Sequence, residues 1–367
     1  MEDSIRILVV DDSALYRQLV RNVLREVPGV EVIGAAKGGQ EALDMVEQLD
    51  PELLTLDVHM PDIDGIAVLR ELKRRKLRTR ALMLSSLTAD GAQVTTDALL
   101  EGAFDFIQKP SGNDVASNRE SLLAALTEKV EAFRASPSSR TRRRGAPVPA
   151  RPFEPASSRA ADDGDASVAA PTGFRCEALV IATSTGGPVA LREVIPNLPG
   201  DLPVPVFIVQ HMPAQYTHSL AERLNQVSPT EVVEGVDGMA AEAGFVYIAP
   251  GGRHMKVERR AGKVRLRITD DPPEQSCRPA ADYLFRSVAE AYQGQVLAVV
   301  MTGMGRDGFA GCREIRQRGG FVIAQHAEGC TVYGMPKAVI DEKLANTVVP
   351  LDRLAVSVTH RIRRSRD

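Results

Sequence analysis

Three polar residues in the second half of the chain have the types that nucleophilic catalysis requires. Ser184 follows the apolar run 178–182 and precedes a Gly-Gly-Pro sequence, while His211 and Asp307 follow further apolar runs. A serine attacks a carbonyl carbon efficiently only when a base removes its proton, and an imidazole base needs a carboxylate to hold its tautomer. A serine hydrolase is therefore one interpretation of these residues.

Each of the three residues also has an ordinary structural interpretation. The sequence Ser-Thr-Gly-Gly-Pro at 184–188 is common in turns that cap helices. His211 could be a core or capping histidine, and Asp307 could cap the helix that follows it. The chain order of Ser, His and Asp differs from the three familiar orders, although a triad is defined by geometry. Other histidines compete for the role of base: His218, His254, His326 and His360.

The first half of the chain has polar residues directly after apolar runs: Asp11, Asp12, Asp57, Ser85 and Lys109. Three carboxylates at one edge of a sheet repel each other unless a cation lies among them, and oxygen ligands favour Mg²⁺. A carboxylate beside Mg²⁺ can attack phosphorus and carry an acyl phosphate. Lys109 supplies a positive charge for the incoming anion. Any one of these aspartates could be a helix N-cap, but capping does not account for the whole set.

The sequence from Gly303 to Gly308 supports an alternative function. It reads G-x-G-x-x-G after an apolar run, as in dinucleotide-binding folds, and Glu328 follows about 20 residues later. These features would suit a phosphorylation-gated Rossmann-type oxidoreductase. The motif comes late in the second half, however, and leaves Ser184 and His211 without roles. A non-catalytic docking regulator is a further alternative.

Apolar runs and helix-compatible segments alternate along both halves, which predicts an α/β protein with two doubly wound parallel-sheet domains. In such sheets the residues just past the carboxyl ends of the strands line one crevice, so each polar set is expected at such an edge. The predicted ranges are 1–135 for a flavodoxin-like domain, 136–172 for a flexible linker rich in Pro, Arg and Ser, 173–358 for a Rossmann-like catalytic domain and 359–367 for a basic tail. The tail is expected to be solvated and frayed.

Composition restricts the remaining function classes. A chain of 367 residues with 44% hydrophobic and 25% charged residues is typical of a two-domain globular protein. A net charge of −3 gives no bias towards nucleic acids or anionic membranes. Neither a signal peptide nor a spanning helix is predicted. The four cysteines form no C-x-x-C pair and have no histidine cluster near them in the sequence, which indicates reduced thiols rather than disulfides or a zinc site: Cys176, Cys277, Cys312 and Cys330.

The polar set of the first half resembles that of the receiver domain of bacterial response regulators, over residues 5–127. Pro61, Asp64, Gly65 and the pair Lys109-Pro110 extend the resemblance. It implies that Asp57 accepts a phosphoryl group. The implied ligands of Mg²⁺ are Asp11, Asp12, Asp57 and the backbone carbonyl of His59. The implied phosphoryl-sensing residues are Ser85 (or Ser86) and Lys109, with an aromatic switch position near Phe106.

A receiver followed by the second half is similar to the chemotaxis protein-glutamate methylesterase family (CheB). The matching segments are 184–188, 210–212 and 301–308. The resemblance implies hydrolysis of γ-glutamyl methyl esters on the cytoplasmic helices of chemoreceptors, giving glutamate and methanol, and deamidation of certain receptor glutamines. It assigns Ser184 as nucleophile, His211 as base and Asp307 as orienting carboxylate. The backbone N–H of Met304, with Thr185 nearby, would bind the oxyanion.

The same resemblance sets the expected partners and cofactors. The substrate would be the cytoplasmic domain of a chemoreceptor, and the phosphodonor a chemotaxis histidine kinase. Mg²⁺ is expected in the receiver and no cofactor in the catalytic domain. A cytoplasmic monomer is expected, with no nucleic-acid partner and no membrane insertion. The unphosphorylated receiver is predicted to cover the catalytic crevice, and phosphorylation of Asp57 to expose it.

Overall fold

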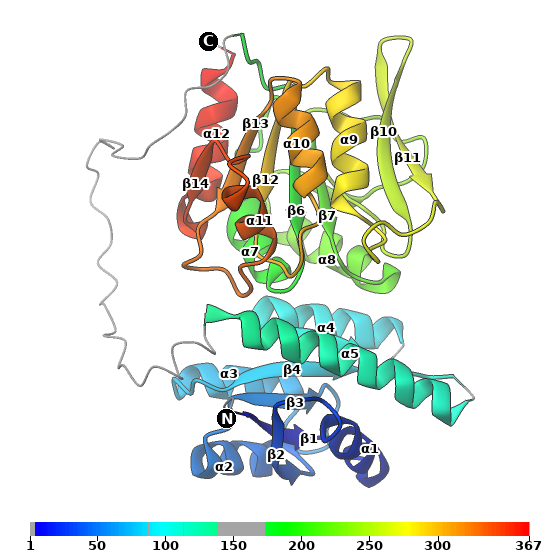
Figure 1. Ribbon diagram of the computed structural model, residues 1–367, viewed down its shortest axis with the longest axis vertical. Helices are drawn as coiled ribbons and strands as arrows, with labels where there is room; N and C mark the ends of the chain where they lie inside the picture. The colour runs from blue at the N-terminus through cyan, green and yellow to red at the C-terminus, as the bar shows by residue number, and fades with distance from the viewer. Residues whose placement is uncertain (1–3, 87, 113, 138–172, 367) are drawn as a thin grey trace.

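The first domain is a five-stranded parallel sheet covered by helices, in the lower half of Figure 1. The computed structural model describes residues 4–86, 88–112, 114–137 and 173–366. The strand order β2-β1-β3-β4-β5 is the flavodoxin-like order predicted from the sequence. The strands are β1 (Ile5–Val10), β2 (Val30–Ala36), β3 (Leu53–Asp57), β4 (Arg80–Ser85) and β5 (Asp105–Gln108). The helices are α1 (Ala14–Leu24), α2 (Gly39–Leu49), α3 (Gly65–Arg74), α4 (Ala89–Glu101) and α5 (Val115–Ala135).

Local sequence explains why these elements form. The central strand β3 is buried along its whole length, as an apolar strand covered by helices on both faces must be. Ser13 and Asp64 act as N-caps: the Ser13 hydroxyl accepts from the N–H of Tyr16, and the Asp64 carboxylate accepts from the N–H of Ala67 at 2.7 Å. The polar residues that follow the strands therefore lie in the strand–helix turns, at the carboxyl edge of the sheet.

The second domain is a seven-stranded parallel sheet with a separate two-stranded antiparallel hairpin, in the upper half of Figure 1. The sheet strands are β6 (Ala178–Thr183), β7 (Val206–Gln210), β8 (Glu231–Glu234), β9 (Phe245–Ile248), β12 (Val296–Val300), β13 (Phe321–Gln325) and β14 (Thr347–Val349). The hairpin strands are β10 (His254–Arg260) and β11 (Lys263–Thr269). The helices are α7 (Gly187–Val194), the 3₁₀ turn η1 (Ile195–Asn197), α8 (Ala214–Val227), α9 (Ala281–Ala291), α10 (Phe309–Gln317), α11 (Met335–Asp341) and α12 (Leu351–Arg364).

The strand order of the large sheet, β14-β13-β12-β6-β7-β9-β8, reverses between β6 and β12. From this point the chain builds outward first on the β7 side and later on the β13 side. A crevice opens where two neighbouring strand-end loops diverge in this way, and ligands of doubly wound sheets bind there. The loops that carry Ser184 and Asp307 follow these two strands.

Four elements were missed by the sequence prediction. The strands β8 and β14 are short, and β8 begins and ends with glutamate, so neither has an apolar run long enough to predict a strand. The helices α11 and α12 were also not predicted. The predicted linker lies almost entirely outside the described residues, which resume at Gly173.

The prediction of a frayed basic tail is wrong for residues 359–366. Helix α12 continues to Arg364, because its buried face packs on the sheet through Val358 and Ile362. The Arg361 guanidinium lies 4.1 Å from the ring centre of Phe321. Arg366 donates to the carbonyl oxygens of Cys176 and Pro203 at 3.1 and 3.0 Å. Arg361 and Arg366 thus help to dock the helix end, whereas Arg363 and Arg364 remain exposed.

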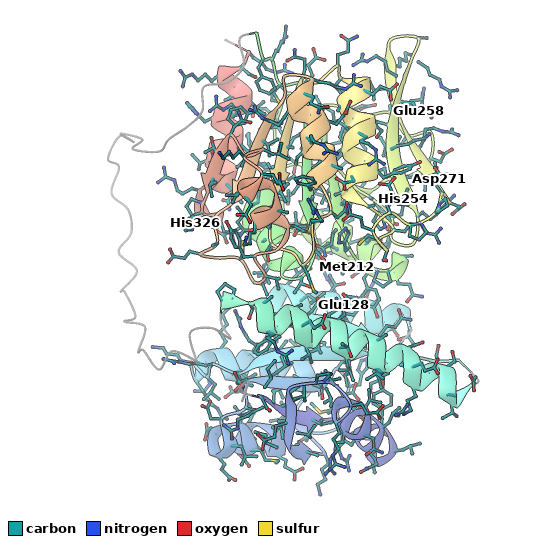
Figure 2. All side chains as sticks on the ribbon, viewed as in Figure 1. Glu128, Met212, His254, Glu258, Asp271 and His326 are labelled. Atoms are coloured by element: carbon teal, nitrogen blue, oxygen red, sulfur yellow. The ribbon has the colours of Figure 1, made fainter. Side chains whose placement is uncertain are left out.

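The two domains are packed together, with α4 of the first against α7 and α8 of the second (Figure 1). Arg223 of α8 forms an ion pair with Asp97 of α4 at 2.7 Å, and Arg192 of α7 donates to the carbonyl of Leu100 at 2.7 Å. Figure 2 labels Met212 and Glu128, which mark the two sides of this boundary. No helix among the described residues is both long and apolar enough to cross a membrane.

Candidate active site

Strand register brings Ser184 and His211 to neighbouring positions. Thr183, the last residue of β6, is paired with Gln210, the last residue of β7. Ser184 and His211 are the next residues, and the N–H of His211 donates to the carbonyl of Thr183 at 3.2 Å. On the other side, the N–H of Ser184 donates to the carbonyl of Thr302, in the loop after β12, at 3.0 Å. The edge predicted from the sequence is therefore the place where these loops meet.

The two glycines after Ser184 allow the turn to fit this edge. Gly186 has a φ of +79°, and a Cβ there would lie 2.2 Å from Oγ1 of Thr331. A Cβ on Gly187 would lie 1.9 Å from Oε1 of Gln210. The Gln210 amide donates to the carbonyl of Ser184 at 3.0 Å, which holds the turn against β7. Both glycines therefore allow a close approach of the backbone that a side chain would prevent.

His211 and Asp307 form the strongest polar pair of the crevice. Nε2 of His211 lies 2.7 Å from Oδ2 of Asp307, which is 3% exposed. The same carboxylate accepts from the backbone N–H groups of Ala281, Asp282 and Gly308 at 2.6, 2.9 and 2.9 Å. Asp307 is thus both a partner of the imidazole and a cap, but mainly of α9 rather than of the helix that follows it in sequence.

The pair has shifted pKa values. Burial opposes the charged form of His211, but hydrogen bonds with Asp307 and Cys277 outweigh it and raise its pKa to about 9. Burial also acts against the charged form of Asp307, yet the hydrogen bond and charge of His211 and the backbone N–H donors lower the pKa of this carboxyl. The raised pKa favours the protonated form of the His211 ring in this arrangement.

Within the described part of the chain, no hydrogen bond joins the Ser184 hydroxyl to His211. The nitrogen that would receive the serine proton, Nδ1, instead lies 3.8 Å from Sγ of Cys277. All four cysteines are free, as expected. The sequence analysis found no histidine cluster near them because Cys277 and His211 are 66 residues apart and meet only through folding.

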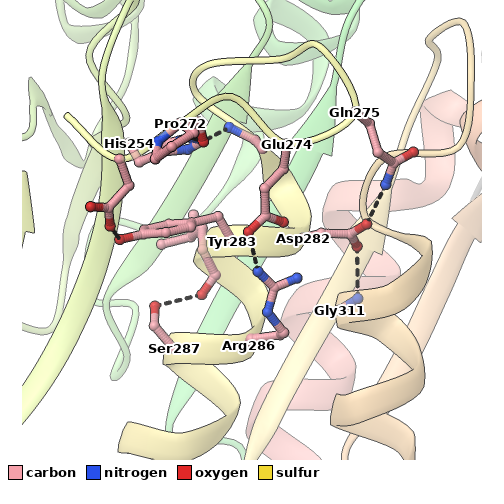
Figure 3. A network of polar contacts seen from close by, with 12 residues as sticks. His254, Pro272, Glu274, Gln275, Asp282, Tyr283, Arg286, Ser287 and Gly311 are labelled. Carbon is pink, nitrogen blue, oxygen red and sulfur yellow. Dashed lines mark hydrogen bonds and ion pairs between the residues drawn. The ribbon is translucent and has the colours of Figure 1, made fainter. Parts of the chain in front are cut away.

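The competing histidines have other roles in the fold. His254 is fully buried, its Nε2 lies 3.1 Å from the carbonyl of Pro272, and its ring stacks on Tyr283 at 4.4 Å (Figure 3). Nδ1 of His326 accepts from the N–H of Glu328 at 3.2 Å. His211 is the histidine that the structure brings to the end of β7.

The first domain covers both residues implied to bind the oxyanion. The hydroxyl of Thr185 donates to Oδ2 of Asp105, at the start of β5, at 2.5 Å. Lys129 of α5 also binds this carboxylate, at 3.0 Å. Met304 packs against an apolar cluster of the first domain, and its neighbour Val332 is buried within that cluster. Asp105 was not predicted to belong to the site, because its local sequence is that of an ordinary strand start.

The carboxylates of the first domain also come together. One ligand oxygen from each of Asp11, Asp12 and Asp57 lies within 4.8 Å of the others. Nζ of Lys109 bridges two of them, at 2.7 Å from Asp11 and 2.9 Å from Asp57. Burial raises the pKa of Asp57, and Asp11 adds to this rise while Lys109 opposes it.

Ser85, the predicted phosphoryl sensor, faces the domain boundary. Its buried hydroxyl accepts from Oγ1 of Thr95 at 2.6 Å and from the hydroxyl of Tyr216, in α8 of the second domain, at 3.2 Å. The ring of Tyr216 packs on that of Phe106, the predicted aromatic switch residue, with 4.3 Å between ring centres. Tyr216 therefore links the predicted phosphoryl-sensing residue to the domain that carries Ser184, a contact that was not predicted from the sequence.

Comparison with known proteins is consistent with this geometry. Residues 179–358 match the family profile of the CheB methylesterase, and residues 7–119 match that of the response regulator receiver domain. A protein-glutamate methylesterase/protein-glutamine glutaminase of Desulfotalea psychrophila is 44% identical over 98% of this chain and 99% of its own. A protein of the same name from Archaeoglobus fulgidus is 41% identical over 96% of this chain and 97% of its own.

A solved structure is also similar to the second domain. The catalytic domain of the Thermotoga maritima CheB methylesterase matches with 41% identity and a TM-score of 0.50, covering 51% of this chain and 98% of its own. These similarities favour the hydrolase interpretation over the dinucleotide-binding alternative. The Gly303–Gly308 loop serves this site: a Cβ on Gly303 would lie 2.9 Å from Cβ of Ser184, and Asp307 binds His211.

Proposed function

Because the chain belongs to the CheB methylesterase family and has an N-terminal receiver domain, we propose that it demethylates chemoreceptors under the control of phosphorylation. The reaction is hydrolysis of glutamate methyl esters to glutamate and methanol, together with deamidation of receptor glutamines. The observation that carries the proposal is the His211–Asp307 pair at 2.7 Å, directly beside the Ser184 turn.

In the proposed mechanism Ser184 Oγ attacks the ester carbonyl while Nδ1 of His211 takes its proton. Asp307 accepts the Nε2–H of the ring and stabilises the imidazolium that forms. The proton then passes to the departing methoxide, which leaves as methanol, and Ser184 holds the glutamyl group as an ester. Water, deprotonated by His211, hydrolyses this ester and restores the serine. The N–H of Met304 and the Thr185 residue are proposed to bind the oxyanion.

The docked arrangement of the domains is an inhibited form. Thr185 is bound to Asp105, and Met304 lies against the first domain. Nδ1 of His211 lies 3.8 Å from Sγ of Cys277, and among the described residues it has no hydrogen bond to the Ser184 hydroxyl. A receptor helix must reach the edge that α4 and α5 now face. We therefore propose that activation separates the first domain from the crevice.

Mg²⁺ fits the acidic site of the first domain, because its donors are carboxylate oxygens that converge without a histidine or a thiol. Asp11, Asp12 and Asp57 are the proposed ligands, with the backbone carbonyl of His59. When bound, the cation neutralises the charge of the phosphoryl donor. Asp57 attacks the phosphorus, the bond between phosphorus and the donor breaks, and the donor leaves without its phosphoryl group. Asp57 becomes an acyl phosphate, and Lys109 moves from the carboxylates to the new phosphoryl oxygens.

Removing the phosphoacceptor should remove regulation but not catalysis. We expect Asp57→Ala to abolish the stimulation of methanol release by a small phosphodonor such as acetyl phosphate, while the unstimulated rate remains. The reason is that Asp57 lies in a different domain from Ser184 and acts only by shifting the docking equilibrium. Methanol release from methylated receptor, with and without the phosphodonor, checks this. Stimulation that survives in Asp57→Ala would show that another residue carries the signal.

The contact between Ser85 and Tyr216 provides a route for that signal. If the Ser85 hydroxyl turns to the phosphoryl group on Asp57, it gives up its hydrogen bond with Tyr216. Phe106 packs on the same ring, so a change in the first domain alters both contacts at once. These two interactions are lost together when the domains separate.

A milder variant tests this route. We expect Tyr216→Phe to raise the unstimulated rate about 2- to 10-fold, because one hydrogen bond is worth about 0.5–1.5 kcal/mol and the ring contact remains. The phosphorylated rate should stay at the wild-type level. Tyr292→Phe is the matched control, since Tyr292 lies at the end of α9 and packs against Phe207 of its own domain. An unstimulated rate equal to wild type in Tyr216→Phe would exclude this hydroxyl from the docking energy.

The proposed partners follow from the reaction. The substrate is the cytoplasmic helical domain of a chemoreceptor, and the phosphodonor is a chemotaxis histidine kinase. The protein is therefore placed in the cytoplasm. The proposed chemistry in the second domain uses the serine, histidine and aspartate side chains without a cofactor.

A further inference from the structure

A thiol lies next to the imidazole of the proposed triad, and catalysis does not use it. Sγ of Cys277 is 3.8 Å from Nδ1 of His211, on the side of the ring away from the Asp307 hydrogen bond. One ligand atom from each of Cys277, His211 and Asp307 lies within 4.8 Å of the others. Cys277 and His211 are only partly buried, so the cluster is open towards the crevice.

A constrained turn positions this thiol. Glu274 and Cys277 exchange two backbone hydrogen bonds, at 3.1 and 2.8 Å, across a turn whose central residues Gln275 and Ser276 both have positive φ. Left-handed backbone is unfavourable for residues other than glycine, so contacts must hold this turn. The Gln275 amide donates to Asp282 at 2.6 Å, and Glu274 pairs with Arg286 (Figure 3). Both partners are on α9, the helix capped by Asp307.

The distances suit a metal ion that binds sulfur and nitrogen. Zinc is bound at about 2.3 Å by sulfur and about 2.0–2.1 Å by imidazole nitrogen, in tetrahedral geometry. Two such ligands lie about 3.5 Å apart, so the observed 3.8 Å needs only a small movement of the thiol. Thiolate and imidazole together select such ions over Mg²⁺. A carboxylate that holds the other ring nitrogen, as Asp307 does, is the usual partner of a metal-binding histidine.

We propose that Cys277 and His211, supported by Asp307, form a binding site for Zn²⁺ that inhibits the esterase. The ion displaces the proton of the Cys277 thiol and the proton that Nδ1 of His211 carries when the ring is charged. It then binds the thiolate and the Nδ1 lone pair, with water completing the coordination. That lone pair is the one that must accept the Ser184 proton, so the loaded site cannot start the reaction. Inhibition rests on the proposed function, whereas the binding itself does not.

Cobalt provides a test that is independent of activity. Co²⁺ is added to the full-length wild type and to Cys277→Ser, Cys176→Ser and Ser184→Ala. We expect a thiolate-to-cobalt charge-transfer absorption in all of them except Cys277→Ser, and we expect Zn²⁺ to remove it. Cys176→Ser is the matched control, because Cys176 is a buried thiol bound to the carbonyl of Ala178, away from the crevice. A missing band in the wild type, or an equal band in Cys277→Ser, would overturn the proposal.

The inhibitory part is tested by methanol release in increasing Zn²⁺. The Zn²⁺ concentration for half-inhibition should rise at least tenfold in Cys277→Ser and stay near wild type in Cys176→Ser and in Cys277→His, which keeps a metal ligand. Half-inhibition of Cys277→Ser and of the wild type at the same Zn²⁺ concentration would contradict the proposed inhibition. The two proposals can fail separately, because Ser184→Ala should retain the cobalt band. A cobalt band in a wild type that releases no methanol would support the metal site and contradict the esterase function. Methanol release by a wild type that shows no cobalt band would support the esterase function and contradict the metal site.

Discussion

Ser184→Ala should lower methanol release from methylated receptor by about 10³-fold or more, and phosphodonor should not restore it. Without the hydroxyl no glutamyl ester can form, and only the positioned donors of the crevice remain to assist water. The fold should tolerate the change, because the Ser184 hydroxyl makes no hydrogen bond among the described residues. The measurement is the rate of methanol release at saturating receptor, with thermal unfolding as a check on folding.

Ser219→Ala is a suitable control for this experiment. Ser219 lies in α8 of the same domain, and its buried hydroxyl has no hydrogen-bond partner within the described ranges, so its loss should leave the rate unchanged. If Ser184→Ala keeps nearly the wild-type rate, another residue is the nucleophile. If the wild type itself releases methanol only at the uncatalysed rate, the second domain acts by docking alone.

Asp307→Asn should reduce the rate about 10³- to 10⁴-fold, since loss of the carboxylate partner leaves the catalytic histidine in the wrong tautomer. An asparagine NH₂ group in place of Oδ2 would face the Nε2–H of His211 and the N–H of Ala281, both of which are donors. The ring would then expose a protonated nitrogen to Ser184. Loss of the anion should also lower the pKa of His211 from its value of about 9.

The pH profile separates this role from a structural one. A base must be neutral, so the rate rises with pH through the pKa of His211, and in Asp307→Asn this rise should move to lower pH. Asp282→Asn is the matched control: Asp282 is also buried at the start of α9, but it accepts from Gly311 and Gln275 and does not touch His211. Its rate should stay within about threefold of wild type. A similar loss in both variants, with no shift in the profile, would mean that Asp307 acts only as a cap of α9.

Much of this molecule could be predicted from local sequence. Short apolar runs that alternate with amphipathic segments specify parallel strands and helices, and the residue after each strand must lie at the crevice edge. This rule alone places Ser184 and His211 at one sheet edge, and Asp57 and Asp11 at the corresponding edge of the other sheet. Elements without a strong local pattern, such as the short strand β8, were not predicted, because the prediction depends on such patterns. The prediction for the C-terminal arginines was wrong because their partners, Phe321, Cys176 and Pro203, are distant in the sequence.

Local sequence specifies which residues can do chemistry and on which sheet edge each lies, because side-chain period and strand direction are local properties. What these residues contact follows from the folded arrangement of the whole chain. The bonds of Thr185 with Asp105, of Tyr216 with Ser85 and of His211 with Cys277 join residues that are 80, 131 and 66 positions apart. Contacts at such separations depend on how loops and whole domains pack, and no periodicity in the chain encodes that packing. The chemistry proposed for this protein is therefore predictable from its residues, whereas the proposed inhibition depends on the packing of the two domains.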